Sequence, residues 1–186
     1  MIYPVTVFGD PVLRKKAEPV TADFKDLKGF IENMFETMYN SDGVGLAAPQ
    51  VGESIRVFIL DTTSDDEDDD EPAGIKRAFI NPEIIDKYGE EWSMNEGCLS
   101  VPEIMEEVFR PESVMVKYQD EKFGTHEELF NGFTARVIQH EYDHLEGILF
   151  VDYLNPLKKR MLKSKLTAIS KGKVIPKYKI KIPGSR

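Results

Sequence analysis

QHEYDHLEG, residues 139–147, contains two histidines four residues apart, and a glutamate directly follows the first of them. Residues four apart on an α-helix lie on the same face, with Cβ atoms about 5–6 Å apart. His140 and His144 could therefore bind one metal ion, and Glu141 could reach a water molecule on that ion. We interpret this stretch as part of a metal-binding helix at the centre of the fold.

The residues around this stretch continue the helical pattern from Phe133 to Glu146, where apolar side chains and the metal-site residues fall near one face. Gly147 follows as the expected end of the helix. A second helix is predicted over 23–39, with Thr21 as its N-cap, because apolar residues recur there at spacings of three and four. A third is predicted over about 157–171.

Runs of β-branched and aromatic residues predict strands over 55–61, 78–85 and 113–120. A short strand and a turn are expected over 124–132, and the Gly-, Ala- and Pro-rich residues 41–52 are not expected to form a regular element. The helices do not alternate regularly with the strands. The sequence therefore favours an α+β fold, with mostly antiparallel short sheets around the metal-binding helix and a helix near the C-terminus.

The chain has 186 residues, a length that suits one domain, 1–186. No apolar stretch approaches the roughly 20 residues of a membrane helix, and the first residues match neither a signal nor a transit peptide. The single cysteine excludes an internal disulfide. We expect a cytoplasmic protein with neither a membrane nor DNA as a partner.

The net charge of −9 conceals two opposed segments. Residues 65–71 are all acidic, and without their seven charges the net charge would be −2. We expect 64–72 to be a mobile acidic loop, because like charges in a block repel one another and stay solvated. A calcium site is the alternative, but the segment lacks the glycine and the spaced ligands of an EF-hand. From Asn155 onward the chain has eleven Lys or Arg residues and no acid, so 155–186 is expected to be a basic C-terminal helix and tail.

A catalytic zinc-type site needs a third protein ligand, and the sequence downstream of His144 offers none of the usual ones. The extended pattern H-E-x-x-H-x-x-G-x-x-H ends here on Phe150, and no Asp or Glu follows Asp152. The third ligand is therefore expected upstream. Cys98, His126 and several carboxylates are candidates, and the affinity of thiolates for borderline metals favours Cys98.

Three segments, GVGLAAPQ (43–50), EGCLS (96–100) and QHEYDHLEG (139–147), together resemble the motifs of the peptide deformylases in order and spacing. The resemblance runs from about Asp10 to Asn155; the acidic insert and the basic tail depart from the pattern. It implies that Cys98, His140 and His144 hold one divalent metal ion, natively Fe(II), with Zn, Ni or Co able to substitute.

The resemblance also implies the reaction: removal of the formyl group from the N-terminal formyl-methionine of nascent polypeptides, with release of formate. A metal-bound water would attack the formyl carbon. Glu141 would be the general acid and base. The Gln50 amide and the Leu99 N–H would form the oxyanion hole. A brace between Glu96 and Arg110 would support the second motif.

The substrate should lie against residues of the first and third motifs. The glycines of 43–50 would let Val44 and Gly45 pair with an extended peptide as an added strand. Phe133 and Val137 precede His140 by seven and three residues, so they should line a slot for the methionine side chain. The resemblance adds Met94 and Val44 to that slot.

Two rival functions remain open from the residues alone. An ordinary metalloendopeptidase would cleave inside peptides and would need a downstream ligand. A non-catalytic RNA-binding module would not need Glu141. The basic tail is expected to contact an anionic partner such as ribosomal RNA, although a solvated helix on the domain surface is an equally simple interpretation.

Overall fold

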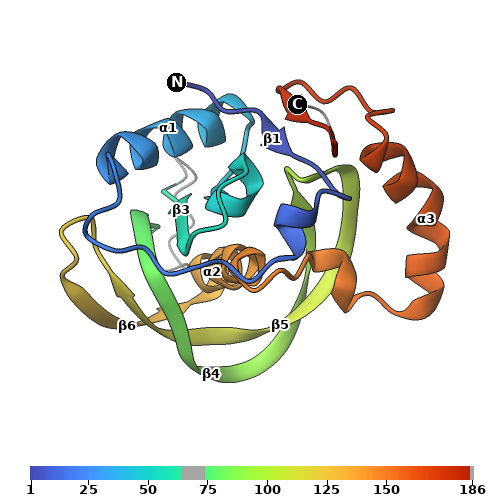
Figure 1. The fold of residues 1–186 in the computed structure, drawn as a ribbon. Helices are drawn as coiled ribbons and strands as arrows, with labels where there is room; N and C mark the ends of the chain where they lie inside the picture. The colour runs from blue at the N-terminus through green and yellow to red at the C-terminus, as the bar shows by residue number, and fades with distance from the viewer. Residues whose placement is uncertain (64–73, 185–186) are drawn as a thin grey trace.

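The computed structural model describes residues 1–63 and 74–184, so the predicted acidic loop lies outside the described residues. Helix α2 (Gly132–Leu145) lies at the centre, with strands below it, α1 (Leu27–Asn40) above and α3 (Pro156–Ser170) at one side (Figure 1). The strands are β1 (Val5–Thr6), β2 (Gly45–Ala47), β3 (Val57–Asp61), β4 (Lys76–Cys98), β5 (Val101–Gln119), β6 (Thr125–Asn131) and β7 (Ile180–Lys181). Short 3-10 helices span Pro11–Arg14, Ala48–Val51 and Phe150–Tyr153.

The main sheet has five antiparallel strands in the order β2-β3-β4-β5-β6. Strands β4 and β5 have 23 and 19 residues and curve together around α2 (Figure 1). The α+β class and the C-terminal helix are therefore confirmed. The predicted extents 78–85 and 113–120 were too short, because the middle of β4 is largely exposed and lacks the alternation that marks a half-buried strand.

Strand β3 separates two layers of the core. Its Phe58 and Leu60 pack in the cluster that contains Ile138 of α2. Its Val57 and Ile59 pack in the cluster that contains the buried face of α1. Successive side chains of a strand point to opposite faces, so one short apolar strand supports both helices.

The three predicted helices are present, but α1 starts later than expected. Its N-cap is Asp26, whose side chain accepts a hydrogen bond from the Gly29 N–H. The Thr21 hydroxyl instead hydrogen-bonds the Asp23 carboxylate, so the predicted N-cap was wrong. Helices α2 and α3 agree with the predicted ranges to within one residue, and Gly147 adopts the left-handed conformation (φ 73°) expected after a helix.

The C-terminal part of the chain packs back onto the molecule. Leu162 and Ile169 of α3 are buried in a cluster with Val7 and Phe150. Strand β7 then pairs in parallel with β1, with Val5 opposite Ile180 (Figure 1). Within the described ranges, no helix combines the length and the apolar character that crossing a membrane requires.

Candidate metal centre

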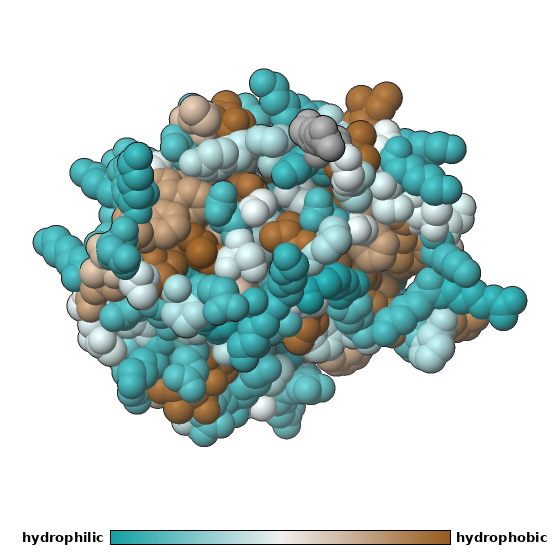
Figure 2. All heavy atoms as spheres, in the orientation of Figure 1, coloured by the Kyte–Doolittle hydropathy of each residue, from teal (hydrophilic) through white to brown (hydrophobic). Residues whose placement is uncertain are grey.

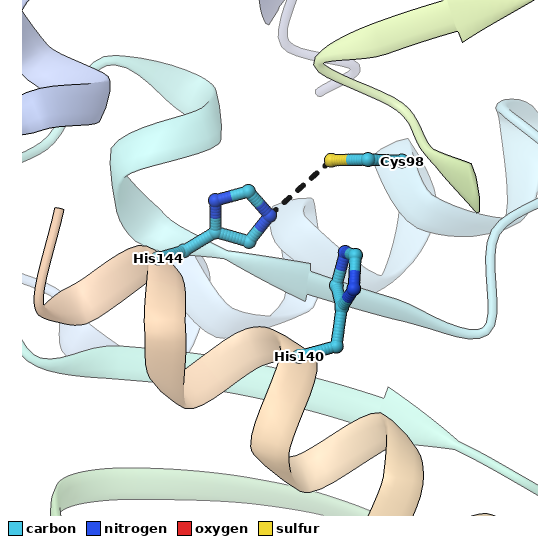
Figure 3. A group of neighbouring side chains, drawn as sticks. All are labelled: Cys98, His140 and His144. Atoms are coloured by element: carbon cyan, nitrogen blue, oxygen red, sulfur yellow. Dashed lines mark hydrogen bonds between the residues drawn. The ribbon is translucent and has the colours of Figure 1, made fainter. Parts of the chain in front are cut away.

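Helix α2 and the end of β4 bring three metal-binding side chains together. His140 and His144 project from one face of α2, and Cys98, the last residue of β4, lies across from them (Figure 3). Their ligand atoms all lie within 4.8 Å of one another, and the Cys98 Sγ is 3.3 Å from the His144 Nε2. Metal bonds of about 2.0–2.3 Å in tetrahedral geometry place ligand atoms roughly 3.3–3.7 Å apart. One thiolate and two imidazoles therefore fit a single divalent ion here.

The structure separates the two upstream candidates for the third ligand. His126 lies on β6, where its Nε2 is 2.8 Å from an Asp120 carboxylate oxygen, and its side chain is 42% exposed. It is not part of the Cys/His/His group. The sequence preference for Cys98 over His126 therefore agrees with the arrangement of the fold.

Glu96 orients the first histidine. Its Oε2 is 2.9 Å from the His140 Nδ1, so a Nδ1–H donor would leave Nε2 free to face the ion. Burial raises the pKa of Glu96, but hydrogen bonds from His140 and Arg110 outweigh it and hold that pKa well below its usual range. Glu96 is therefore a carboxylate that can accept the imidazole proton.

The predicted ion pair between Glu96 and Arg110 is confirmed. The guanidinium donates two hydrogen bonds to the carboxylate, at 2.6 and 3.0 Å, and both side chains are buried. Arg110 also donates to Asp143 at 2.7 Å, and Arg136 donates to Glu96 at 3.0 Å. Two arginines and two carboxylates thus balance each other beneath His140, which removes the cost of unpaired buried charge.

The second histidine is held in a form that can bind metal. His144 is 1% exposed, and burial lowers its pKa well below the usual value. Its Nδ1 makes no hydrogen bond with any described residue. A neutral imidazole is the form that a metal ion requires.

Glu141 lies beside the ligands with one oxygen uncommitted. It is 4% exposed, and burial raises its pKa to about 7. Its Oε2 makes no hydrogen bond within the part of the chain that the structure describes. A Cβ added to Gly45 would come within 2.5 Å of the Glu141 Oε1, so the glycine is what allows the 43–50 segment to approach this carboxylate. A buried carboxyl group with a pKa near neutrality can both accept and donate a proton.

Gln50 and Leu99 are both neighbours of Cys98, Gln50 through its side chain and Leu99 through the sequence. The Gln50 Oε1 accepts a hydrogen bond from the Ala47 N–H at 2.7 Å, and its amide nitrogen is 3.5 Å from the Cys98 Sγ. The NH2 group is thereby aimed at the metal centre. Leu99 and Ser100 form the turn between β4 and β5, directly after the ligand Cys98.

A cavity of about 550 Å³ opens onto these residues. All of the sequence-predicted substrate residues line it, as do the two predicted oxyanion donors and Glu141: Val44, Gly45, Met94, Phe133, Val137, Gln50, Leu99 and Glu141. This volume is large enough for several residues of an extended peptide. The cavity and the metal ligands thus form one continuous site.

Comparison with known proteins identifies the family. A family model described as polypeptide deformylase matches residues 2–160, which is most of the chain. The chain belongs to this family. It is 51% identical to a peptide deformylase of Christiangramia forsetii over 193 residues, covering 100% of this chain and 98% of that protein. The resemblance drawn from the three motifs is confirmed, and the chain is an enzyme, a metal-dependent hydrolase.

Solved structures of the family agree with the fold. A peptide deformylase of Legionella pneumophila matches with a TM-score of 0.81 and 39% identity, covering 93% of this chain and 98% of that one. The peptide deformylase of Thermotoga maritima matches with a TM-score of 0.74 and 47% identity, covering 84% of this chain and 99% of that one.

Several residues of this deformylase site were not predicted. Arg136 could have been found, because it precedes His140 by four residues on the same helix and therefore shares its face. For Asp143 the sequence signal is weaker: it is an acidic residue within the segment QHEYDHLEG (139–147). The cavity-lining residues Pro176 and Tyr178 carry no local signal, since they come from the end of the chain.

Proposed function

We propose that this enzyme hydrolyses the formyl group from the N-terminal formyl-methionine of newly synthesised polypeptides. Water adds to the formyl carbon and the C–N bond breaks, so the products are formate and a free amino terminus. The observation that carries the proposal is the convergence of Cys98, His140 and His144, beside the buried Glu141, at a peptide-sized cavity.

The metal ligands in this proposal are Cys98, His140 and His144. We take Fe(II) as the native ion, as the resemblance to the family implies, with Zn, Ni or Co able to substitute, because thiolate and imidazole ligands can bind each of these ions. When bound, a divalent ion lowers the pKa of a water molecule and polarises a carbonyl group. Glu96 supports the set by holding the ring of His140 in place.

Glu141 is proposed to move the proton. Its pKa of about 7, raised by burial, allows it to take a proton from the attacking water near neutral pH. It then gives that proton to the amine that leaves. The uncommitted Oε2 is available for both transfers.

Gln50 and Leu99 are proposed to stabilise the negative oxygen of the tetrahedral intermediate. The Gln50 NH2 group faces the ligand Cys98 because its Oε1 is held by the Ala47 N–H. The backbone N–H of Leu99 is the second donor. Both are fixed before the substrate arrives, which is how such donors lower a barrier.

The substrate backbone is proposed to extend along β2. This strand is at the edge of the main sheet, and only its β3 side is paired in the described sheet. An edge strand offers unpaired N–H and C=O groups to a peptide. Val44 and Gly45 would pair with the substrate, while Met94, Phe133 and Val137 would line the slot for the methionine side chain.

We further propose that residues 1–186 act as one functional domain in the cytoplasm and that the basic C-terminal segment contacts the ribosome. Lys159, Arg160, Lys163 and Lys165 of α3 are exposed. Figure 2 shows hydrophilic residues over the outer side of α3. Their positive charge matches RNA phosphate, which surrounds the site where the substrate emerges.

The direct test is metal analysis of enzyme purified without oxygen, combined with an assay of formate released from formyl-Met-Ala-Ser. We expect one divalent ion per chain and formate release that a chelator abolishes and Fe(II) restores. Cleavage within longer peptides without formate release would instead support a metalloendopeptidase. Formate release from a metal-free chain would contradict the proposed mechanism.

A further inference from the structure

The C-terminal segment reaches the cavity although it lies beyond the residues that the family model matches. That match ends at residue 160, yet Pro176 and Tyr178 line the cavity together with Leu99. The segment is held there by backbone pairing with β1: the Val5 N–H donates to the Lys179 carbonyl at 2.9 Å (Figure 1). An anchored strand can place side chains more reproducibly than a free tail can.

Tyr178 makes one specific contact with the machinery of the site. Its hydroxyl donates a hydrogen bond to the Leu99 carbonyl at 2.8 Å, across 79 residues of sequence. The ring is partly buried. The contact fixes the carbonyl of the residue whose N–H we assign to the oxyanion hole.

The turn after Cys98 is held from a second direction as well. The Phe8 N–H, just after β1, donates to the Ser100 carbonyl at 2.8 Å. Because β1 and β7 are themselves paired, both carbonyls of this turn are tied to one small two-stranded unit. The Tyr178 hydroxyl binds the Leu99 carbonyl, and the Phe8 N–H, just after β1, binds the Ser100 carbonyl.

Donors of an oxyanion hole act through their position, so a small displacement of the Cys98–Leu99 peptide group, which carries the Leu99 N–H, has a large effect on rate. We propose that Tyr178 is a positioning residue of this active site: its hydroxyl holds the Leu99 carbonyl so that the N–H of the same residue stays aimed at the reacting carbonyl. The inference rests on the proposed function and adds a residue outside the family motifs to it. Tyr178 and Pro176 also line the cavity, and we assign them to the part of its wall that lies beyond the methionine slot.

Tyr178→Phe removes the hydroxyl and keeps the ring, and Tyr3→Phe is a matched control. Tyr3 also makes one hydroxyl hydrogen bond, with Asn33 at 3.2 Å, and it does not line the cavity. We expect Tyr178→Phe to lower kcat roughly 3- to 30-fold on formyl-Met-Ala-Ser while KM changes less than about twofold, since the oxyanion donor acts in the transition state. Metal content should be unchanged, and Tyr3→Phe should keep the kcat of the unaltered enzyme.

Limited proteolysis of the C-terminal segment shows whether Tyr178 positions Leu99 or only keeps this segment attached to the rest of the molecule. If kcat falls in Tyr178→Phe while the tail remains as resistant to trypsin as before, the proposal is supported. A kcat within twofold of the unaltered enzyme would overturn it, as would a fall in kcat that appears only together with release of the tail.

A second variant, Tyr178→Ala, also removes the ring. It should raise KM for formyl-Met-Ala-Ser more than for formyl-Met itself, because only the longer substrate reaches the wall. An equal change for both substrates would refute the wall assignment. Absence of formate release by the unaltered chain would refute the proposed function, an outcome distinct from any comparison among these variants.

Discussion

Glu141 is buried among charged groups, yet its Oε2 has no hydrogen-bond partner among the described residues. Leaving such an atom unpaired costs about 1–3 kcal/mol, so it indicates a partner that joins during function. Glu141→Gln keeps the size of the side chain but cannot accept the proton. We expect it to retain metal and fold and to lose on the order of 10²–10⁴ in kcat. Metal analysis together with steady-state kinetics tests this, and a near-normal rate at full metal occupancy would exclude Glu141 as the base.

Substitution of Cys98 should lower the metal content, whereas substitution of Glu141 should not. Cys98→Ala removes one of the three proposed metal ligands, so metal content and formate release should fall together. Oxidation of the thiolate by peroxide should have the same effect. Metal analysis and the formate assay, applied to Cys98→Ala and to the unaltered enzyme before and after peroxide treatment, test both expectations. If Cys98→Ala keeps its full metal content, the third ligand is a carboxylate or His126 instead.

Gly45 has a more local role, because a Cβ at this position would lie 2.5 Å from the Glu141 Oε1. Gly45→Ala should therefore displace Glu141 and lower kcat about 10- to 100-fold, the cost of misplacing a catalytic group by a fraction of an ångström to 1 Å. The metal ligands are not touched, so metal content should be unchanged. An unaltered kcat in Gly45→Ala would show that the Glu141 carboxylate can shift without a loss of activity.

At the scale of elements, α2 presents different faces to the core and to the cavity. Val137 and Phe133 line the cavity together with His140, whereas Tyr142 lies on another side of the helix, where it lines a separate surface hollow with Arg56. Helical periodicity predicted that Val137 and Phe133 share the face of His140, since it depends on local geometry. The same reasoning missed the full length of β4, because its exposed middle is held by backbone pairing with β5.

Enlarging the cavity face of α2 should block the methionine slot. Val137→Trp should leave metal content unchanged and lower kcat/KM for formyl-Met-Ala-Ser by at least about tenfold, because the added ring occupies space that the substrate needs. Tyr142→Trp enlarges a side chain on another face of the same helix and should keep its kcat/KM. If Val137→Trp has the same kcat/KM as the unaltered enzyme, Val137 does not line the methionine slot.

At the scale of the whole molecule, the two ends of the chain meet beside the active site and α3 presents its basic residues outward. Truncation after Asn155 would remove these charges, but it would also remove Tyr178 and the buried Leu162 and Ile169. Substitution of surface charges is therefore the cleaner way to examine ribosome binding.

Replacing Lys159, Lys163 and Lys165 with Gln should weaken ribosome binding and make it less dependent on salt, because fewer counterions are released. Replacing Lys25, Lys28 and Lys122, which are exposed outside α3, removes the same charge elsewhere. Sedimentation with ribosomes across a salt series provides the comparison. Equal losses in both sets would indicate non-specific attraction, and no loss in the α3 set would contradict the proposed contact.

The sequence by itself determined the relation of His140, Glu141 and His144, because spacing on a helix is a local property of the backbone. It also excluded a downstream ligand, and three motifs in order identified the family. The three motifs already implied Cys98 as the upstream partner of the two histidines, but only the tertiary structure shows how these side chains come together. Cys98 and His144 are 46 residues apart, and Leu99 and Tyr178 are 79 apart. Such pairs meet only because β4 curves around α2 and the tail pairs with β1, and no local pattern encodes contacts over those separations.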